Sequence, residues 1–195
     1  MSAPLGTSRL AATLEDTRDA VRNAGVVLLS EIVQSSTELQ KLVAFENAFD
    51  RVFNLIRLEG SLSQGGIVVQ DCLELLANLV RHNPSNQSLF RETGCVSQLA
   101  QLLQEVDKKE EKEGDEESWP SPQKDKNIWG LLSIIRLFLS EGGLGTQDNQ
   151  AAFFKNGLLQ QVLELAFSEA AEGPIKAEVQ PSPIIESRIH AYYFQ

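Results

Sequence analysis

The feature that most restricts the fold is a segment that the chain contains twice. Residues 85–103, SNQSLFRETGCVSQLAQLL, return at 148–166 as DNQAAFFKNGLLQQVLELA. The matched positions are polar at the start of each copy, glycine in the middle and apolar afterwards: Asn86 and Asn149, Gln87 and Gln150, Phe90 and Phe153, Gly94 and Gly157, Val96 and Leu159, Leu99 and Val162, Leu102 and Leu165. Each copy has the pattern of a short helix, a glycine turn and a longer amphipathic helix. Such repetition is typical of stacked-helix arrays, so we predict an all-α solenoid of the armadillo or HEAT type.

A weaker third copy precedes these two, in residues 37–60. Its apolar residues keep a helical spacing: Leu39, Leu42, Val43, Phe45, Phe49, Val52, Phe53, Leu55 and Ile56. With one gap in the alignment, Val43 takes the place of Phe90, and Glu46-Asn47-Ala48 takes the place of Glu92-Thr93-Gly94. Ala48 then stands where the clear copies have glycine. The alignment predicts about three repeats.

Further helices are predicted from apolar spacing outside the two clear copies, over 9–24, 26–33, 67–81 and 128–139. We expect Gly25 to break the chain between the first and the second. A β-strand is the alternative for 26–33, but helices on both sides favour a helix. Pro84 cannot donate a backbone hydrogen bond, so the helix before it ends there, and Ser85 or Asn86 is suited to cap the next one.

Two insertions lengthen the spacing between the clear copies. Residues 104–126 hold nine acidic and five basic residues, two prolines and almost no apolar side chains. Such a segment buries too little surface to offset its ordering entropy, so we predict a disordered acidic loop, a solvated insertion rather than a docking segment. A glycine-rich loop follows at 141–146. We predict an armadillo-like domain over residues 1–178 and an irregular tail over 179–195.

Composition and charge exclude several classes of function. The formal net charge of −10 disfavours a nucleic-acid binder, which needs a basic surface to neutralise phosphates. It also disfavours direct binding to anionic lipid. No apolar run reaches the roughly 20 residues that a membrane span requires, and the N-terminus lacks the apolar stretch of a signal peptide. Cys72 and Cys95 lie among apolar helical residues, so we expect reduced core side chains in an intracellular protein.

The sequence predicts no catalytic, cofactor or metal site. The histidines are His82 and His190, and neither stands in a zinc or triad spacing. We expect the paired amides Asn86, Gln87, Asn149 and Gln150 to cap the short helices and to bond neighbouring helices, rather than to form a site. A hydrolase using Cys95 is the enzymatic alternative, which we consider improbable. No binding residue can be assigned from the sequence.

Three passages together resemble a known family: VAFENAFDRVFNLIRLEG, then GGIVVQDCLELLANLVRHNPSNQSLFRETG, then NQAAFFKNGLLQQVLELA. They are similar to the armadillo-like head of the general vesicular transport factor, also called transcytosis-associated protein. The resemblance covers about residues 10–178. Its most specific part is Gly65–Gly94, because generic armadillo and HEAT repeats do not share that amino-acid sequence.

The resemblance implies a protein-binding region of a tether that promotes vesicle docking before fusion, in endoplasmic reticulum-to-Golgi and intra-Golgi transport. It implies Rab-family GTPases, SNAREs and golgins as partners. It also implies a cytoplasmic location, with peripheral attachment to Golgi and vesicle membranes through those partners. Family members dimerise through a coiled coil that this sequence lacks, and the repeat pattern stops after Val179. We therefore expect a fragment, a truncated gene model or a divergent short product.

A cytosolic armadillo adaptor or regulatory subunit unrelated to membranes is the alternative. In either case the helix at Leu158–Phe167 is the last of the array. Terminal repeats normally carry a polar cap, so we expect poor solubility or self-association unless the tail covers this helix.

Overall fold

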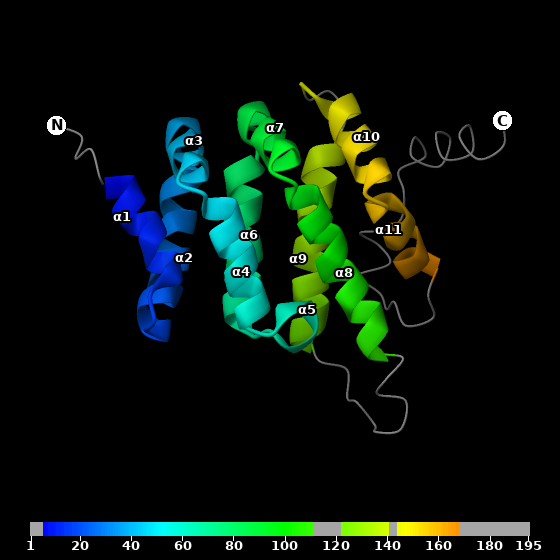
Figure 1. The fold of residues 1–195 in the computed structure, drawn as a ribbon, viewed down its shortest axis with the longest axis horizontal. Coiled ribbons are helices and arrows are strands. Elements are labelled where there is room, and N and C mark those ends of the chain that lie inside the picture. Colours follow the sequence, from blue (N-terminus) through cyan, green and yellow to red (C-terminus); the bar gives the residue numbers. More distant parts are fainter. Residues whose placement is uncertain (1–5, 111–121, 141–143, 168–195) are drawn as a thin grey trace.

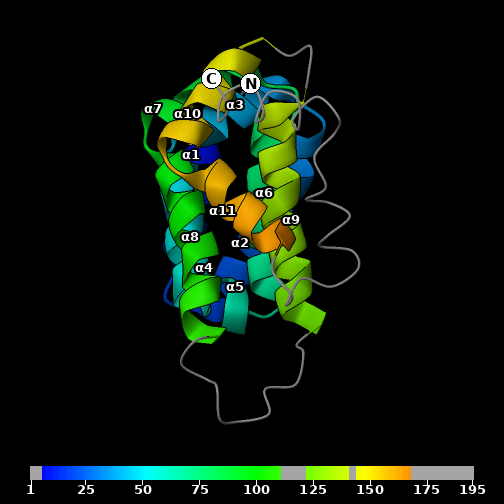
Figure 2. The same cartoon turned by 90° about the vertical axis from the view of Figure 1, so that its right-hand side faces the viewer.

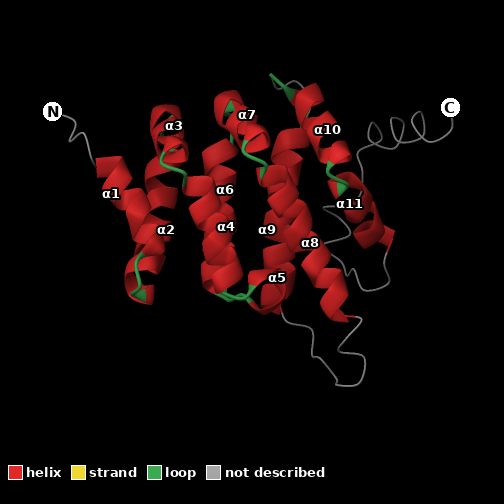
Figure 3. Ribbon diagram, in the orientation of Figure 1, coloured by secondary structure: helices red, strands yellow, loops and turns green. Residues whose placement is uncertain are grey.

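The computed structural model describes residues 6–110, 122–140 and 144–167, and within these ranges the regular structure is entirely helical (Figure 3). The helices are α1 (Gly6–Ala12), the 3-10 turn η1 (Thr13–Glu15), α2 (Asp19–Gln34), α3 (Thr37–Phe45), α4 (Ala48–Leu58), α5 (Ser61–Gln64), α6 (Ile67–Val80), α7 (Pro84–Glu92), α8 (Cys95–Glu110), α9 (Pro122–Leu139), α10 (Thr146–Lys155) and α11 (Leu158–Phe167). The predicted all-α class is confirmed.

Three units of one design follow each other along the longest axis of the molecule (Figure 1). Each consists of a long helix, a short helix and a second long helix: α2–α3–α4, then α6–α7–α8, then α9–α10–α11. The first long helices of the units form one layer, the second long helices form the other, and the short helices α3, α7 and α10 cover one edge (Figures 1 and 2). This arrangement confirms a solenoid of about three repeats.

A line of aromatic rings runs through all three units. The Phe90 ring on α7 contacts Phe49 of α4 and Phe138 of α9, each with ring centroids 5.1 Å apart. Phe138 in turn contacts Phe153 of α10 at 5.3 Å. Phe90, Phe138 and Phe153 are fully buried. The repeated phenylalanine of the short helix is therefore the residue that ties each unit to the next.

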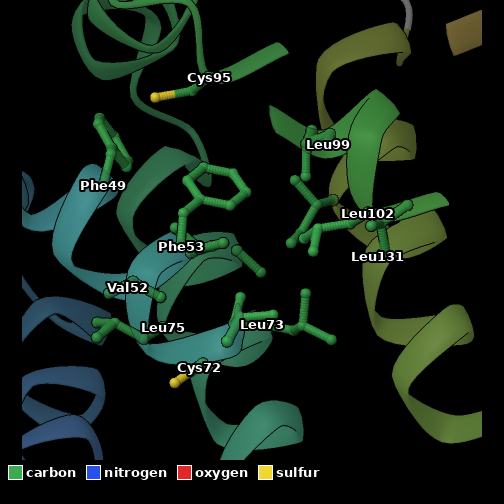
Figure 4. Close-up of a cluster of buried hydrophobic side chains, with 14 of the residues drawn as sticks. Phe49, Val52, Phe53, Cys72, Leu73, Leu75, Cys95, Leu99, Leu102 and Leu131 are labelled. Atoms are coloured by element: carbon green, nitrogen blue, oxygen red, sulfur yellow. The ribbon is translucent and has the colours of Figure 1, made fainter. Parts of the chain in front are cut away.

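Aliphatic side chains fill the space between the two layers beneath these rings. Figure 4 shows Val52 of α4, Leu99 of α8 and Leu131 of α9 pointing into one cluster, and each is fully buried. Burying a side chain of this size stabilises the fold by roughly 1.5–3 kcal/mol relative to leaving it exposed. The apolar positions shared between the sequence copies thus form a continuous core across the units.

The predicted break at Gly25 is wrong. Gly25 lies inside α2, and the chain instead turns at Asp16, whose carboxylate accepts hydrogen bonds of 2.9 Å from the backbone N–H and the guanidinium of Arg18. These bonds hold the pKa of the Asp16 carboxyl below its usual value. A Cβ at position 25 would lie 2.1 Å from Oγ1 of Thr13. Glycine is present because η1 packs directly against α2, not because a helix ends there.

The alignment of the first copy with the second needs correction by one residue. The turns between short and long helices place Gly94 at φ 76°, Gly157 at φ 71° and Asn47 at φ 60°. Asn47, not Ala48, therefore takes the glycine position, and Ala48 begins α4. Asparagine tolerates this left-handed conformation better than most residues with a side chain. With this pairing, positions in the first two copies lie 47 residues apart with no gap.

The predicted acidic loop at 104–126 is too long at both ends. Helix α8 continues to Glu110, and α9 begins at Pro122. Val106 is buried and keeps α8 attached to the core, while the lysines and glutamates beyond it are good helix formers. Pro122 suits the first turn of a helix, where no backbone donor is needed. Residues 111–121, 141–143 and the predicted tail at 179–195 lie outside the described residues.

Candidate functional site

Buried amide side chains line the interior of the short-helix edge between the first two units. Gln40 of α3 donates a 2.8 Å hydrogen bond to the backbone carbonyl of Asn78 on α6. Asn83 donates to Oε1 of Gln40 at 2.9 Å, and the Asn78 side chain donates to Oγ of Ser30 on α2 at 2.9 Å. Each amide is almost fully buried. Unpaired, such groups would be costly, so the network fixes how α3 and α6 meet.

The same kind of network joins the second unit to the third. Asn86 and Gln87 of α7 donate to the last carbonyls of α6, those of Leu79 at 2.8 Å and Val80 at 3.1 Å. Asn149 of α10 donates to Oε1 of Gln87 at 3.0 Å and to the Phe138 carbonyl at 2.9 Å. The predicted bonding between neighbouring helices is confirmed for Asn86, Gln87 and Asn149.

The predicted capping by these amides is wrong. Asn83 is the N-cap of α7, because its side chain accepts a 3.1 Å hydrogen bond from the backbone N–H of Asn86. Ser36 occupies the matched position 47 residues earlier and caps α3 in the same way. The α10 cap is Gly145, which has no side chain to accept a bond. Gln150 lies on α10 and is partly buried.

Arg91 takes part in the junction between the second and third units, which the sequence did not indicate. Its guanidinium donates to Oδ1 of Asn149 and, at 3.1 Å, to Oγ of Ser88, and it lies 3.9 Å from the carboxylate of Asp148. Arginine does not recur at this position of the repeat, because the matched residue of the third unit is Phe154. A charged residue at a position that differs between copies therefore contributes to one junction only.

The two cysteines are structural. Both are free and buried, in agreement with the prediction of reduced core residues. Burial raises the pKa of the Cys95 thiol to about 11 and raises that of Cys72 as well. A thiol with this pKa is almost entirely protonated at neutral pH, and the thiolate is the nucleophilic form. The geometry therefore opposes the hydrolase alternative that would use Cys95.

The described residues were predicted to hold no metal centre, and the arrangement of possible ligands bears on that prediction. Within residues 6–110, 122–140 and 144–167, no three His, Cys, Asp or Glu side chains come together as metal ligands. His82 is exposed at the end of α6, and His190 lies outside the described residues. Across the same ranges, no helix has the length and apolar character to cross a bilayer. What remains as a candidate site is the surface.

One exposed apolar surface lies on α3. Phe45 is 75% exposed and Leu42, one turn earlier, is 50% exposed. We call these two residues the Phe45 patch. The sequence had placed both in the helical apolar pattern of a core, and the structure corrects that placement. The apolar residues of α3 that face the core are Val43 and Ala44.

Comparison of the units shows that the fold does not require an apolar residue at position 45. Phe45, Glu92 and Lys155 are each the last residue of their short helix, and each precedes the left-handed turn by two positions. All three are exposed. The same structural position therefore accepts an aromatic, an acidic and a basic residue, so the packing of the stack does not require the aromatic residue.

Three acidic residues lie on α3, directly after it, or at the end of α7, which contacts it. Glu38 lies on α3, Glu46 follows Phe45 directly, and Glu92 ends the neighbouring helix α7. The basic residue of α3 is Lys41, whose ammonium group lies 3.3 Å from the Glu38 carboxylate. We call Glu38, Glu46 and Glu92 the acidic rim of the patch, in a chain whose formal net charge is −10.

Known proteins show the same fold with a related sequence. General vesicular transport factor p115 of Bos taurus and of Homo sapiens are each 40% identical to this chain over 178 residues, which is 90% of this chain and 18% of the relative. Intracellular protein transport protein USO1 of Saccharomyces cerevisiae is 39% identical over 86% of this chain and 9% of the relative. The chain belongs with the general vesicular transport factors. It spans less than a fifth of their length.

Solved structures of Uso1 agree with this relationship. Two crystal structures of Uso1 match the chain with TM-scores of 0.82 and 0.83 at 36% identity. They cover 91% of this chain, which corresponds to 25% and 27% of the Uso1 chains. No protein-family model matches. The general vesicular transport factors are named for transport rather than for catalysis.

Proposed function

We propose that this chain is a protein-binding region of a vesicle-tethering factor that acts in endoplasmic reticulum-to-Golgi and intra-Golgi transport, before fusion. The observation that carries the proposal is the agreement of sequence and fold with p115 and Uso1 over about nine-tenths of the chain. A helical stack of this kind binds through surface complementarity and needs no cofactor.

Rab-family GTPases, SNAREs and golgins are the proposed partners, and the proposed location is cytoplasmic, with attachment to Golgi and vesicle membranes through those partners. The net charge of −10 favours partners with basic segments and speeds their association at low salt. Association rates that do not change with ionic strength would remove the electrostatic part of the proposal.

A chimera tests the proposed function. The matching segment of yeast Uso1 is replaced by residues 1–178 of this chain in cells depleted of the natural protein, and transport of a secretory cargo from the endoplasmic reticulum to the Golgi is followed. Transport near the natural level supports the proposal. A chimera that is abundant and folded but fails to support transport contradicts it.

The alternative is an armadillo adaptor unrelated to membranes. Affinity capture with the full chain separates the two functions, because a tether recovers Golgi tethers and SNAREs whereas an unrelated adaptor does not. The Phe45→Glu variant serves as a matched bait, since it alters the exposed apolar surface and leaves the core unchanged.

A further inference from the structure

We propose that the Phe45 patch binds an amphipathic helix of a partner protein, one whose apolar side chains are flanked by lysine or arginine. This inference rests on the proposed protein-binding function and names the surface and the chemistry of the partner.

The exposure is not a by-product of folding. Glu92 and Lys155 show that the last position of a short helix accepts charged residues in the same stack. The Phe45 ring is 75% exposed at this position. Contact with water is less favourable for an apolar ring than for a charged side chain. Exposed apolar groups rimmed by polar residues are typical of protein-binding surfaces.

The second unit shows that a unit packed ahead of α3 would leave Phe45 accessible. Helix α7 has α3 beside it, and there Leu89 is partly buried while Glu92 stays exposed. Leu42 matches Leu89, and Phe45 matches Glu92. A preceding unit would therefore cover part of Leu42 and leave Phe45 free, so the surface persists in a longer array.

The geometry suits a helix as the occupant. Leu42 and Phe45 stand three residues apart, so they lie one above the other on a single helix face. Such a ridge packs against the apolar ridge of a second helix, in the manner of helix-in-groove recognition. Helix α1 also contacts α3 near the N-terminal end of the stack (Figure 1), yet Leu42 and Phe45 stay exposed.

The charge of the rim selects the partner. Glu46 follows Phe45 directly, Glu92 ends the neighbouring helix α7, and the charge of Lys41 is offset by Glu38. A basic flank on the partner helix complements this rim, whereas an acidic flank is repelled. An anionic membrane surface is repelled as well, which favours a protein helix over direct insertion of Phe45 into lipid.

Three defined helical peptides and two types of vesicle serve as probes. The first peptide has leucines at helical spacing and flanking lysines, the second has glutamates in place of the lysines, and the third has the composition of the first in scrambled order. The vesicles are of phosphatidylcholine, with and without phosphatidylserine. Fluorescence anisotropy gives the affinity of each peptide for the full chain, and amide NMR shifts locate the binding surface.

The expected result is that the lysine-flanked peptide binds the chain and shifts resonances of α3, and that the chain, tested without peptide, binds neither vesicle. Phe45→Glu and Phe45→Lys, the residues that the other units carry, both weaken it about tenfold or more, as for an anchor residue. Leu58→Glu is the matched control, because Leu58 is 69% exposed on α4 and Glu105 stands at its matched position. It leaves the affinity unchanged.

Several outcomes overturn the inference. The first is that the glutamate-flanked or the scrambled peptide binds as tightly as the lysine-flanked peptide, or that no peptide binds. The second is that Leu58→Glu weakens peptide binding as much as the Phe45 variants do, or that only Phe45→Lys weakens it. The third is that the chain binds either vesicle in preference to the peptides. Circular dichroism of each variant shows that the fold is intact. The Uso1 chimera reports separately on the proposed function, so the two tests fail independently.

Discussion

Helices α3 and α7 occupy the same place in consecutive units, yet they differ in what they present to solvent. Inside, both carry a buried glutamine at positions 47 residues apart, and both glutamines donate to carbonyls of α6. Gln40 reaches Asn78 in the next unit, and Gln87 reaches Val80 in its own unit. Outside, α3 ends on exposed Phe45 and α7 ends on Glu92. The matched interior explains the fold, and the unmatched exterior is where function is to be sought.

This difference separates two kinds of position in a repeat protein. A residue that recurs in register is constrained by its contacts within and between units. A residue that changes its chemistry at the same exposed position without changing the fold is free of that constraint. The following predictions test this separation, beginning with the largest expected effect.

Replacing the recurring phenylalanine should be the most damaging change. Phe90→Ala removes a fully buried ring that contacts Phe49, Phe53 and Phe138, so we expect a loss of about 3–5 kcal/mol in the free energy of unfolding. Urea unfolding followed by circular dichroism measures it. Phe45→Ala is the control and should stay within about 0.5 kcal/mol of the natural chain. Similar losses for the two variants would refute the separation.

The buried amide network should come next. Asn149→Ala leaves Oε1 of Gln87 and the Phe138 carbonyl without this donor, which we expect to cost about 2–3 kcal/mol. Hydrogen exchange should become faster in α10 and α11 while α2 to α4 keep their protection. Asn156→Ala removes an exposed amide on the same side of the third unit and should change little. Equal exchange in both variants would show that the network does not hold the third unit.

Gly25 tests whether close packing, rather than a helix break, requires glycine. Gly25→Ala places a methyl group 2.1 Å from Oγ1 of Thr13, so we expect a loss of about 1–2 kcal/mol. Gly66→Ala is the control, because no atom lies within 4 Å of its added Cβ. Combining Gly25→Ala with Thr13→Ala should recover part of the loss in thermal or urea unfolding. No recovery would mean that the contact is not the cause.

The smallest effect should come from the turn that fixes the alignment. Asn47→Gly relieves a left-handed conformation and should stabilise the protein by at most about 0.5 kcal/mol. Ala48→Gly puts glycine into the first turn of α4 and should cost about 1 kcal/mol. The signs would be reversed if Ala48 were the residue equivalent to Gly94.

The sequence predicted the features that depend on periodicity. Apolar spacing and the repeated Phe90 and Phe153 were enough for the fold class, the number of units and the buried amide bonds. Features that depend on one particular contact were missed. Asn47 stands in for glycine through its own tolerance of positive φ, and Gly25 is explained by a neighbour twelve residues earlier in the chain.

The candidate site could not be predicted for a related reason. Phe45 has the spacing of a core residue, and only the packing of α3 shows that Val43 and Ala44 face inward while Phe45 faces out. The repeat pattern gives no signal for Arg91 either, because its position does not recur, although it bonds to Asn149 across the junction. Periodicity identifies which residues repeat, but contacts decide which face each residue occupies.

The most direct test of the central claim is the free energy of unfolding of the Phe45→Glu variant, measured by urea denaturation beside the natural chain. If the residue is free of the constraints of the stack, the two values agree within about 0.5 kcal/mol, as expected for a surface substitution. A loss of about 2 kcal/mol or more would place Phe45 in the core and contradict the separation of recurring from variable positions.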